Sequence, residues 1–260
     1  MAFDCIRFDV SDSIATLTLD RPDKLNSFTE AMLREIRAAV DEASRSEAVR
    51  VLVMTGSGRA FSAGQDLSEV TGKPGVELRS LLDELYNPLI RAIRGLDKPV
   101  VASVNGIAAG AGANLALAAD IVLAARSAGF IQAFSKIGLV PDSGGSHALP
   151  RLVGRARALG LTLLGEPVSA ETAEAWGLIW ACIDDDKLEE ETAALARRLA
   201  DGPTAALGLI KRAIDAAATN SLDQQLDLER DYQQIASQTE DYREGVRAFL
   251  EKRPPRFRGK

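Results

Sequence analysis

The pattern of apolar and polar residues predicts a series of short strands in the first two thirds of the chain. Residues 14–19 (IATLTL) alternate between β-branched and other apolar side chains, which favours a strand, and residues 3–9 favour another before it. Residues 49–55 (VRVLVMT) and 121–125 (IVLAA) are mostly apolar, which is typical of strands buried on both faces. A further strand is expected within residues 178–183.

Apolar residues at helical spacing predict helices between and after these strands. Ser27 or Thr29 can cap the first one, Ser169 can cap another that ends near Trp176, and Gly154 is expected to interrupt a helix over 149–164. The remaining predicted helices span 75–94, 188–200, 203–218, 222–236 and 242–250. Strands that alternate with helices, followed by helices alone, indicate an α/β core over residues 1–200 and a helical C-terminal region over 201–260.

Residues 98–120 (KPVVASVNGIAAGAGANLALAAD) are expected to form a buried strand, a glycine-rich bend and the start of a short helix. Glycine lets a backbone approach a ligand closely, and the first amides of a helix lack internal partners, so this stretch can bind an anion or a developing oxyanion. A buried core element without a ligand is the alternative. A membrane span is disfavoured because the stretch contains polar residues and glycines and is rich in alanine rather than leucine.

Composition and charge narrow the class of protein. The 260 residues carry a formal charge of −6, from 31 basic and 37 acidic residues, which argues against a nucleic-acid surface as the main function. The two cysteines, Cys5 and Cys182, match no metal or redox spacing, and the acidic N-terminus is unlike a signal peptide. We therefore expect a cytoplasmic protein that binds neither nucleic acid nor membrane and holds no metal.

Two junctions between a strand and the following loop offer similar chemistry. The amides of Ala63 and Gly64 lie in a turn that follows the strand ending near Thr55, and those of Ala111 and Gly112 lie at a predicted helix start. Two such amides that converge on one oxygen would form an oxyanion hole. Two unrelated buried turns are the alternative.

Asp142 lies in a glycine-rich turn (PDSGG) before a helix, and two roles are open for it. It can act as a helix cap, or it can point into an apolar pocket formed by residues such as Ala111, Ile131 and Phe134. Burial in such a pocket would raise its pKa and make it a usable general base. His147, the only histidine, is expected at the surface or at a cap.

Ser62 raises a different possibility, because AFSAG is one glycine short of the nucleophile elbow of hydrolases. A hydrolase of that kind also needs a histidine late in the fold and an acid before it. Since His147 is the sole candidate, the sequence disfavours a catalytic triad.

Three long motifs, AFSAGQDL at 60–67, KPVVASVNGIAAGAGANLALAAD at 98–120 and IGLVPDSGGSHALPRLVG at 137–154, resemble the crotonase superfamily of acyl-CoA enzymes. The likeness extends to RPDKLNS at 21–27 and EGVRAFLEKRPPRF at 244–257. It implies a spiral of ββα units, assembly as a homotrimer or a dimer of trimers, and C-terminal helices that pack in the trimer and cover an active site. It also implies that the amides of Ala63 and Ala111 hold the thioester oxygen, and that Lys24 lies along coenzyme A.

The sequence departs from the hydratases of this superfamily, which use two glutamates to split water. Asn114 and Phe134 stand at those positions and cannot exchange a proton. The motifs are more similar to the branch that isomerises CoA thioesters. The resemblance thus implies conversion of ring-1,2-epoxyphenylacetyl-CoA to oxepin-CoA in phenylacetate degradation, a shift of a 3-enoyl-CoA double bond to the 2 position, or both, with Asp142 moving the proton.

The resemblance implies no cofactor, since coenzyme A is part of the substrate. The alternatives are an enoyl-CoA hydratase with water held by Asn114 and Asp142, and a non-catalytic CoA- or RNA-binding homologue.

Residues 68–75 look mobile, and residues 68–80 are a candidate lid. The expected substrate-binding residues are Lys24, Leu25, Ala63, Gly64, Gln65, Asp66, Gly110 and Asn114.

Overall fold

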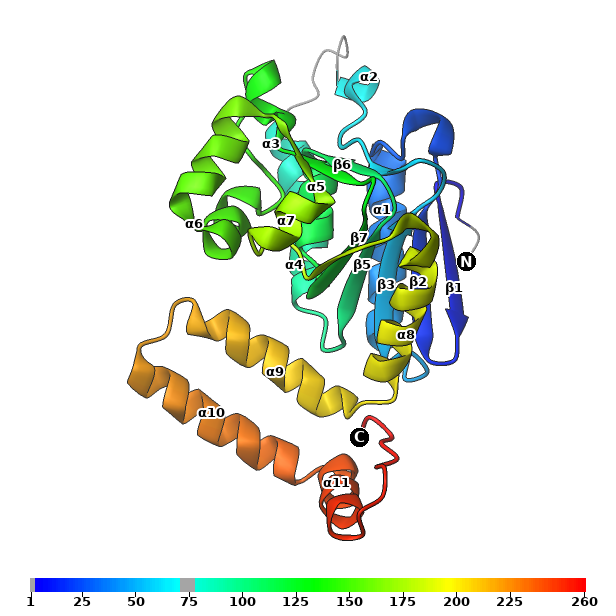
Figure 1. Cartoon of the computed structure of the whole chain (residues 1–260), viewed down its shortest axis with the longest axis vertical. Coiled ribbons are helices and arrows are strands. Elements are labelled where there is room, and N and C mark those ends of the chain that lie inside the picture. The colour runs from blue at the N-terminus through cyan, green and yellow to red at the C-terminus, as the bar shows by residue number, and fades with distance from the viewer. Residues whose placement is uncertain (1–2, 71–77) are drawn as a thin grey trace.

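The chain folds into two sheets flanked by helices (Figure 1). The structure is a computed structural model that describes residues 3–70 and 78–260. The six-stranded sheet has the order β1-β2-β3-β5-β7-β10, and the four-stranded sheet has the order β4-β6-β8-β9. The larger sheet contains β1 (Ile6–Ser11), β2 (Ile14–Leu19), β3 (Val51–Gly56), β5 (Val100–Val104), β7 (Ile121–Ala125) and β10 (Ala181–Ile183). The smaller contains β4 (Ala60–Ser62), β6 (Ile107–Ala109), β8 (Gly129–Ile131) and β9 (Pro167–Ser169).

The chain visits the two sheets in turn. It runs from β3 to β4, from β5 to β6 and from β7 to β8, and the three strands of each set pair in parallel within their own sheet. Each pair is followed by one or more helices before the next pair begins. This repeated path confirms the predicted α/β spiral of ββα units. The strand β6 was not predicted, because its three residues lie inside a run with no alternation.

Several helix predictions are confirmed at the level of the cap. Helix α1 (Glu30–Arg45) begins after Thr29, whose side chain accepts a hydrogen bond from the amide of Met32. Helix α7 (Ala170–Ala175) begins after Ser169, which accepts from the amide of Thr172. Helix α6 (Gly145–Leu164) starts before the predicted residue 149 and is interrupted at Gly154, where φ is 75° and ψ is 163°.

The helical run before β5 is less regular than its apolar spacing predicts. It consists of α3 (Leu78–Leu81), a π-helical segment (Leu82–Tyr86) and α4 (Asn87–Arg94). The predicted first residues, 75–77, lie outside the described residues, as do residues 71–77 of the candidate lid. The short helix α2 (Leu67–Val70) follows the AFSAGQD motif. A π-helical segment is uncommon and often marks a functional site.

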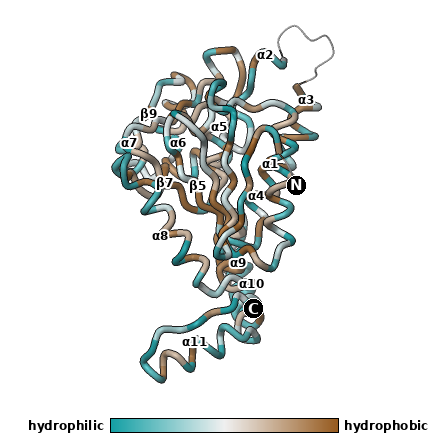
Figure 2. Tube along the Cα trace, turned by 90° about the vertical axis from the view of Figure 1, so that its right-hand side faces the viewer, coloured by the Kyte–Doolittle hydropathy of each residue, from teal (hydrophilic) through white to brown (hydrophobic). Residues whose placement is uncertain are grey.

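The larger sheet is covered on both faces. Helix α1 contacts β1, β2 and α4, whereas α8 (Leu188–Ala200) contacts β2, β3, β5 and β7. Along β2, Ala15, Leu17 and Leu19 are fully buried, and the residues between them are half-buried, as the alternation predicts. Figure 2 shows hydrophobic residues concentrated along the central strands, including β5 and β7.

The last three helices are α9 (Thr204–Ala217), α10 (Leu222–Ser237) and α11 (Glu240–Leu250), close to the predicted spans. They lie at the opposite end of the molecule from α2, α3 and β6 (Figure 1). Arg50 attaches them to the core, since its guanidinium donates to Thr204 Oγ1 at 2.9 Å and to Phe257 O at 3.2 Å. The division at residues 200 and 201 stays a prediction.

Candidate active site

The segment after β4 presents a backbone amide without an acceptor. Phe28 forms a parallel bridge with this segment: its amide donates to Gly64 O at 2.7 Å, and Asp66 N donates to Phe28 O at 2.9 Å. Because Gly64 and Asp66 make these bonds, the intervening Gln65 N–H faces the opposite side. It meets no acceptor in residues 3–70 and 78–260.

The amide of Ala63 is not free, contrary to the sequence-based expectation. Its N–H donates to Leu25 O at 2.9 Å, because the loop that carries Lys24 and Leu25 lies against it. The candidate donor after β4 is therefore Gln65, two residues further along. The sequence placed Gln65 among the substrate-binding residues but did not identify its amide as the free one.

A second unbonded amide lies next to the first. Ala111 is the first residue of α5 (Ala111–Leu117), and its N–H has no acceptor in the described part of the chain. Gly64 adopts φ +86°, and a Cβ there would lie 2.7 Å from Ala109 O and 3.4 Å from Ala111 N. The two segments are thus in backbone contact, and a larger residue at position 64 would separate them. Gly64, the residue before Gln65, therefore lies against the segment that carries the Ala111 amide.

Asp142 lies in the loop before α6, and its carboxyl is half-buried. Burial raises the pKa of Asp142, while a 2.9 Å hydrogen bond from Ser143 Oγ to Oδ1 acts in the opposite direction. Burial is the largest cause of the shift, and the hydrogen bonds to the carboxyl only partly offset it.

Asn114 holds the backbone of this loop in place. It is 2% exposed, its Nδ2 donates to Asp142 O at 2.9 Å, and its Oδ1 accepts from Gln132 Nε2 at 2.9 Å. Asp142 O also accepts from Gly145 N at 2.8 Å, where α6 begins. Asn114 was predicted to contact substrate, but in this structure its amide group is engaged with the protein at both ends.

A cavity of about 270 Å³ opens beside Asp142. Its apolar lining comes from Leu78, Leu82, Leu139 and Val140, and Asp142 is the only acidic or basic residue among the described residues that line it. The predicted apolar neighbours of Asp142, namely Ala111, Ile131 and Phe134, are not among them. Phe134 is buried instead beside Gly110, within 4 Å of the position that a Cβ of Gly110 would take.

Tyr86 connects the π-helical segment to Gln65, a contact that the sequence did not reveal. Its hydroxyl donates to Gln65 Oε1 at 2.6 Å, and its ring packs edge-on against Phe28 with 6.2 Å between ring centroids. The tyrosine is 3% exposed, and burial, followed by the charge of Asp142, raises its pKa. The one available signal was a tyrosine within an apolar stripe, since a buried hydroxyl needs a partner.

Lys24 and Asp66, two further predicted site residues, differ in their surroundings. Lys24 is exposed at the end of a 3-10 turn (Pro22–Lys24), and its side chain has no ion-pair partner in the described ranges. Asp66 accepts hydrogen bonds from Ser68 and Arg21, and the Ser68 bond is the main cause of its lowered pKa. Asp66 therefore fixes the loop.

Ser62 is not placed as a nucleophile. It is fully buried, its hydroxyl donates to Asn26 O at 2.7 Å, and it accepts from Gly64 N at 3.2 Å. His147 is exposed, as expected, and has no hydrogen bond to Ser62. The triad alternative therefore lacks its central pair.

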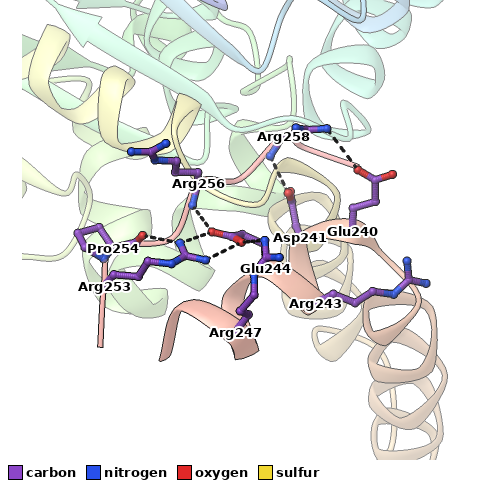
Figure 3. A pocket seen from close by; sticks show the side chains of 9 residues that line it. All are labelled: Glu240, Asp241, Arg243, Glu244, Arg247, Arg253, Pro254, Arg256 and Arg258. Atoms are coloured by element: carbon purple, nitrogen blue, oxygen red, sulfur yellow. Dashed lines mark hydrogen bonds and ion pairs between the residues drawn. The ribbon is translucent and has the colours of Figure 1, made fainter. Parts of the chain in front are cut away.

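A larger cavity, of about 900 Å³, lies at the far end of the molecule between α11 and the C-terminal tail (Figure 3). Glu244 accepts hydrogen bonds there from Arg247, from Arg253 and from the backbone amide of Arg256, which lowers its pKa well below the usual range. Asp241 accepts from the amides of Arg258 and Gly259. These bonds fix the tail on α11.

Residues 3–70 and 78–260 contain no cluster of His, Cys, Asp and Glu side chains that could hold a metal ion. No helix in these ranges is long and apolar enough to cross a membrane.

Comparison with known proteins supplies the family. Residues 9–260 match the family described as enoyl-CoA hydratase/isomerase. The chain is 54% identical to the 1,2-epoxyphenylacetyl-CoA isomerase of Escherichia coli K12, covering 96% of this chain and 97% of that protein. It is 50% identical to a protein of Rhodobacter capsulatus named "probable enoyl-CoA hydratase", with full coverage of both. The crystal structure of an enoyl-CoA hydratase from Bacillus anthracis superposes with a TM-score of 0.94 at 32% identity, covering 99% of this chain and 100% of that one.

Proposed function

Because the chain belongs to the enoyl-CoA hydratase/isomerase family, we propose that it is an isomerase of CoA thioesters that converts ring-1,2-epoxyphenylacetyl-CoA to oxepin-CoA and shifts the double bond of 3-enoyl-CoA to the 2 position. The observation that carries the proposal is a half-buried carboxylate, Asp142, beside a cavity with an apolar lining, in a chain that also has two unbonded amides, those of Gln65 and Ala111. The substrate follows from the 54% identity to the Escherichia coli isomerase.

The two amides account for binding of the thioester. The N–H groups of Gln65 and Ala111 donate to the thioester oxygen, and they bind it most strongly when charge develops there. Removal of a proton from the carbon next to the thioester leaves an enolate whose charge resides on this oxygen. Fixed donors lower the cost of forming that enolate. Lys24 is exposed, and we propose that its ammonium binds the phosphates of coenzyme A.

Asp142 accounts for the proton transfer. Its carboxylate takes a proton from C2 of a 3-enoyl thioester, which leaves a dienolate with its charge on the thioester oxygen. When the proton returns to C4, the thioester carbonyl re-forms, C2–C3 becomes the double bond and C3–C4 becomes a single bond. One group performs both steps, so no second acid is required. The raised pKa of Asp142 suits this exchange better than that of an exposed carboxyl.

Hydration of an enoyl-CoA is the second candidate function, because the Rhodobacter capsulatus relative is named a probable enoyl-CoA hydratase. It requires one group to activate water and another to protonate carbon. The two positions that hold glutamate in hydratases are taken by Asn114 and Phe134. Asn114 is also committed to Asp142 O and Gln132, which leaves Asp142 without an acid-base partner.

The test compares isomerisation with hydration in purified protein. With 3-hexenoyl-CoA, the wild-type chain is expected to form the conjugated 2-enoyl thioester, and Asp142→Asn to lower kcat by about 10²–10⁴-fold. Asp41→Asn is the control, because Asp41 pairs with Arg37 on α1. Hydration of crotonyl-CoA at a rate similar to isomerisation would overturn the proposal. Conversion of ring-1,2-epoxyphenylacetyl-CoA to oxepin-CoA can be followed by NMR, because the two isomers have equal mass and are not distinguished by it.

We also propose that the chain assembles as a homotrimer or a dimer of trimers. Large apolar side chains on the C-terminal helices are exposed in the single chain, including Ile214, Leu222, Phe249 and Leu250. Exposed apolar surface of this extent favours a protein interface. Since α9–α11 lie far from the amide site of their own chain, any cover they give would be to a neighbouring copy. Sedimentation equilibrium gives the mass of the assembly, and a monomer at micromolar concentration would exclude it.

A further inference from the structure

The side chain of Gln65 is held at both ends of its amide group. Its Nε2 donates to Phe28 O at 3.1 Å and to Asp66 O at 3.3 Å, and its Oε1 accepts from the Tyr86 hydroxyl at 2.6 Å. The backbone amide of the same residue is the unbonded donor after β4. The side chain of Gln65 therefore fixes the position of the residue that carries the unbonded N–H.

Tyr86, which bonds to Gln65, is the last residue of an irregular helical segment. The π-helical segment (Leu82–Tyr86) also supplies Leu82 to the cavity beside Asp142, and Asn87, the next residue, lines that cavity too. The Tyr86 ring is clamped by its edge-on contact with Phe28, the residue that pairs with Gly64 and Asp66. One segment thus contacts Gln65, which carries the unbonded amide, and also lines the cavity beside Asp142.

We propose that Tyr86 is a positioning residue for the Gln65 amide: its hydroxyl bond to Gln65 Oε1 sets the direction of the Gln65 N–H toward the thioester oxygen. This inference rests on the proposed function, in which that N–H is an oxyanion donor. Tyr86 does not touch the reacting atoms. It acts through Gln65, so that the amide is aligned before substrate arrives.

Because Tyr86 is buried, loss of its hydrogen bond to Gln65 Oε1 would not be replaced by a bond to bulk water. Tyr86 is 3% exposed, and without its hydroxyl the Gln65 Oε1 loses the one donor that it has among the described residues. The glutamine amide would then turn to find another donor and carry its backbone with it. Burial and the charge of Asp142 both keep the phenol protonated, so it donates rather than accepts at neutral pH.

The variant Tyr86→Phe removes the hydroxyl and keeps the ring against Phe28. The direct readout is the absorption of bound 4-dimethylaminocinnamoyl-CoA, a conjugated thioester whose absorption moves to longer wavelength when its carbonyl is polarised. We expect a smaller red shift than in wild type, with kcat for 3-hexenoyl-CoA lower by about three- to tenfold and KM within about twofold. A general loss of stability would not selectively reduce the shift of bound probe.

Two further variants make the test specific. Gln65→Met removes the acceptor, and Tyr86→Phe in that background is expected to cause no further loss, because both changes remove the same bond. Thr192→Val, on α8, removes another buried hydroxyl, which is hydrogen-bonded to Ser103 Oγ at 2.9 Å. This variant is expected to leave the red shift and kcat unchanged.

The outcomes separate the two proposals. If wild type neither shifts the probe nor isomerises 3-hexenoyl-CoA, the proposed function fails. If wild type does both and Tyr86→Phe has the wild-type red shift and kcat, only the role of Tyr86 fails. Additive losses in the double variant would also overturn that role, because Tyr86 would then act independently of Gln65.

Discussion

The side-chain amide of Asn114 donates to the backbone carbonyl of Asp142 across 2.9 Å. Asn114 therefore supports the loop that carries the proposed base. The same asparagine accepts a hydrogen bond from Gln132, so α5, the segment after β8 and the loop before α6 are linked through one buried side chain.

Truncation of this link should affect both folding and turnover. Asn114→Ala removes the donor to Asp142 and leaves Gln132 Nε2 without its acceptor, which is expected to lower the free energy of unfolding by about 1–3 kcal/mol. The kcat for isomerisation should fall as well, because the Asp142 loop loses one of its two backbone anchors. Urea unfolding and steady-state kinetics measure the two effects. Asn220→Ala is the matched control, since Asn220 bonds to Gln225 near α10; an equal loss of kcat there would contradict the prediction.

The pH dependence of turnover should show the raised pKa of Asp142. Only the ionised carboxylate can take a proton, so the rate should fall at acid pH with an apparent pKa above 3.8, the ordinary value. A profile of kcat/KM between pH 4 and 8 measures this limb. His147→Gln should leave the profile unchanged, although His147 is the only histidine. A limb at or below pH 3.8, or one that disappears with His147, would contradict the assignment.

The same carboxyl should make stability depend on pH. Because its pKa is raised on folding, the folded state binds the proton more tightly than the unfolded chain does. The resulting stabilisation is complete below about pH 3.8 and is lost as pH rises through the higher folded-state pKa. Asp142→Asn abolishes this dependence, so relative to wild type the variant should gain stability between acid and neutral pH. Urea unfolding of both proteins at pH 4 and pH 7 tests it; a constant difference would exclude the effect.

Gly64 should be intolerant of substitution. In Gly64→Ala the new Cβ would lie 2.7 Å from Ala109 O, and the φ of +86° is unfavourable for alanine. We expect kcat to fall by about 10²-fold, as for loss of an oxyanion donor, and unfolding free energy to fall by about 1–3 kcal/mol. Gly160→Ala on α6 is the matched control, because a Cβ there meets nothing within 4 Å. It should gain about 0.5–1 kcal/mol and keep kcat; similar losses in both variants would refute the argument.

The sequence predicts the strands and helices well where the periodicity is strong. Alternation in β2 and the caps at Thr29 and Ser169 determine those elements locally, and the structure agrees. The π-helical segment was not foreseen, because its apolar spacing resembles that of an α-helix. The early start of α6 was missed because its first residues include glycine and serine, which usually indicate a loop.

The structure changes several details of the site that the sequence predicts. The sequence located the glycine-relieved turn after β4, but which amide stays unbonded depends on the Leu25 carbonyl, nearly 40 residues away in the chain. The partners of Asn114 and Tyr86 are also distant in sequence, at Asp142 and Gln65. Long-range pairing of this kind leaves no local pattern, so only the fold reveals it.

The alternating path between the two sheets distributes the proposed site residues over three successive ββα units. Gln65 follows the β3–β4 pair, Ala111 follows β5–β6, and Asp142 follows β7–β8. The first two units thus carry the donors proposed for the thioester, and the third carries the proposed proton acceptor. In such an arrangement, substitutions in the third unit can change the reaction during evolution, while the thioester donors of the other two units are retained.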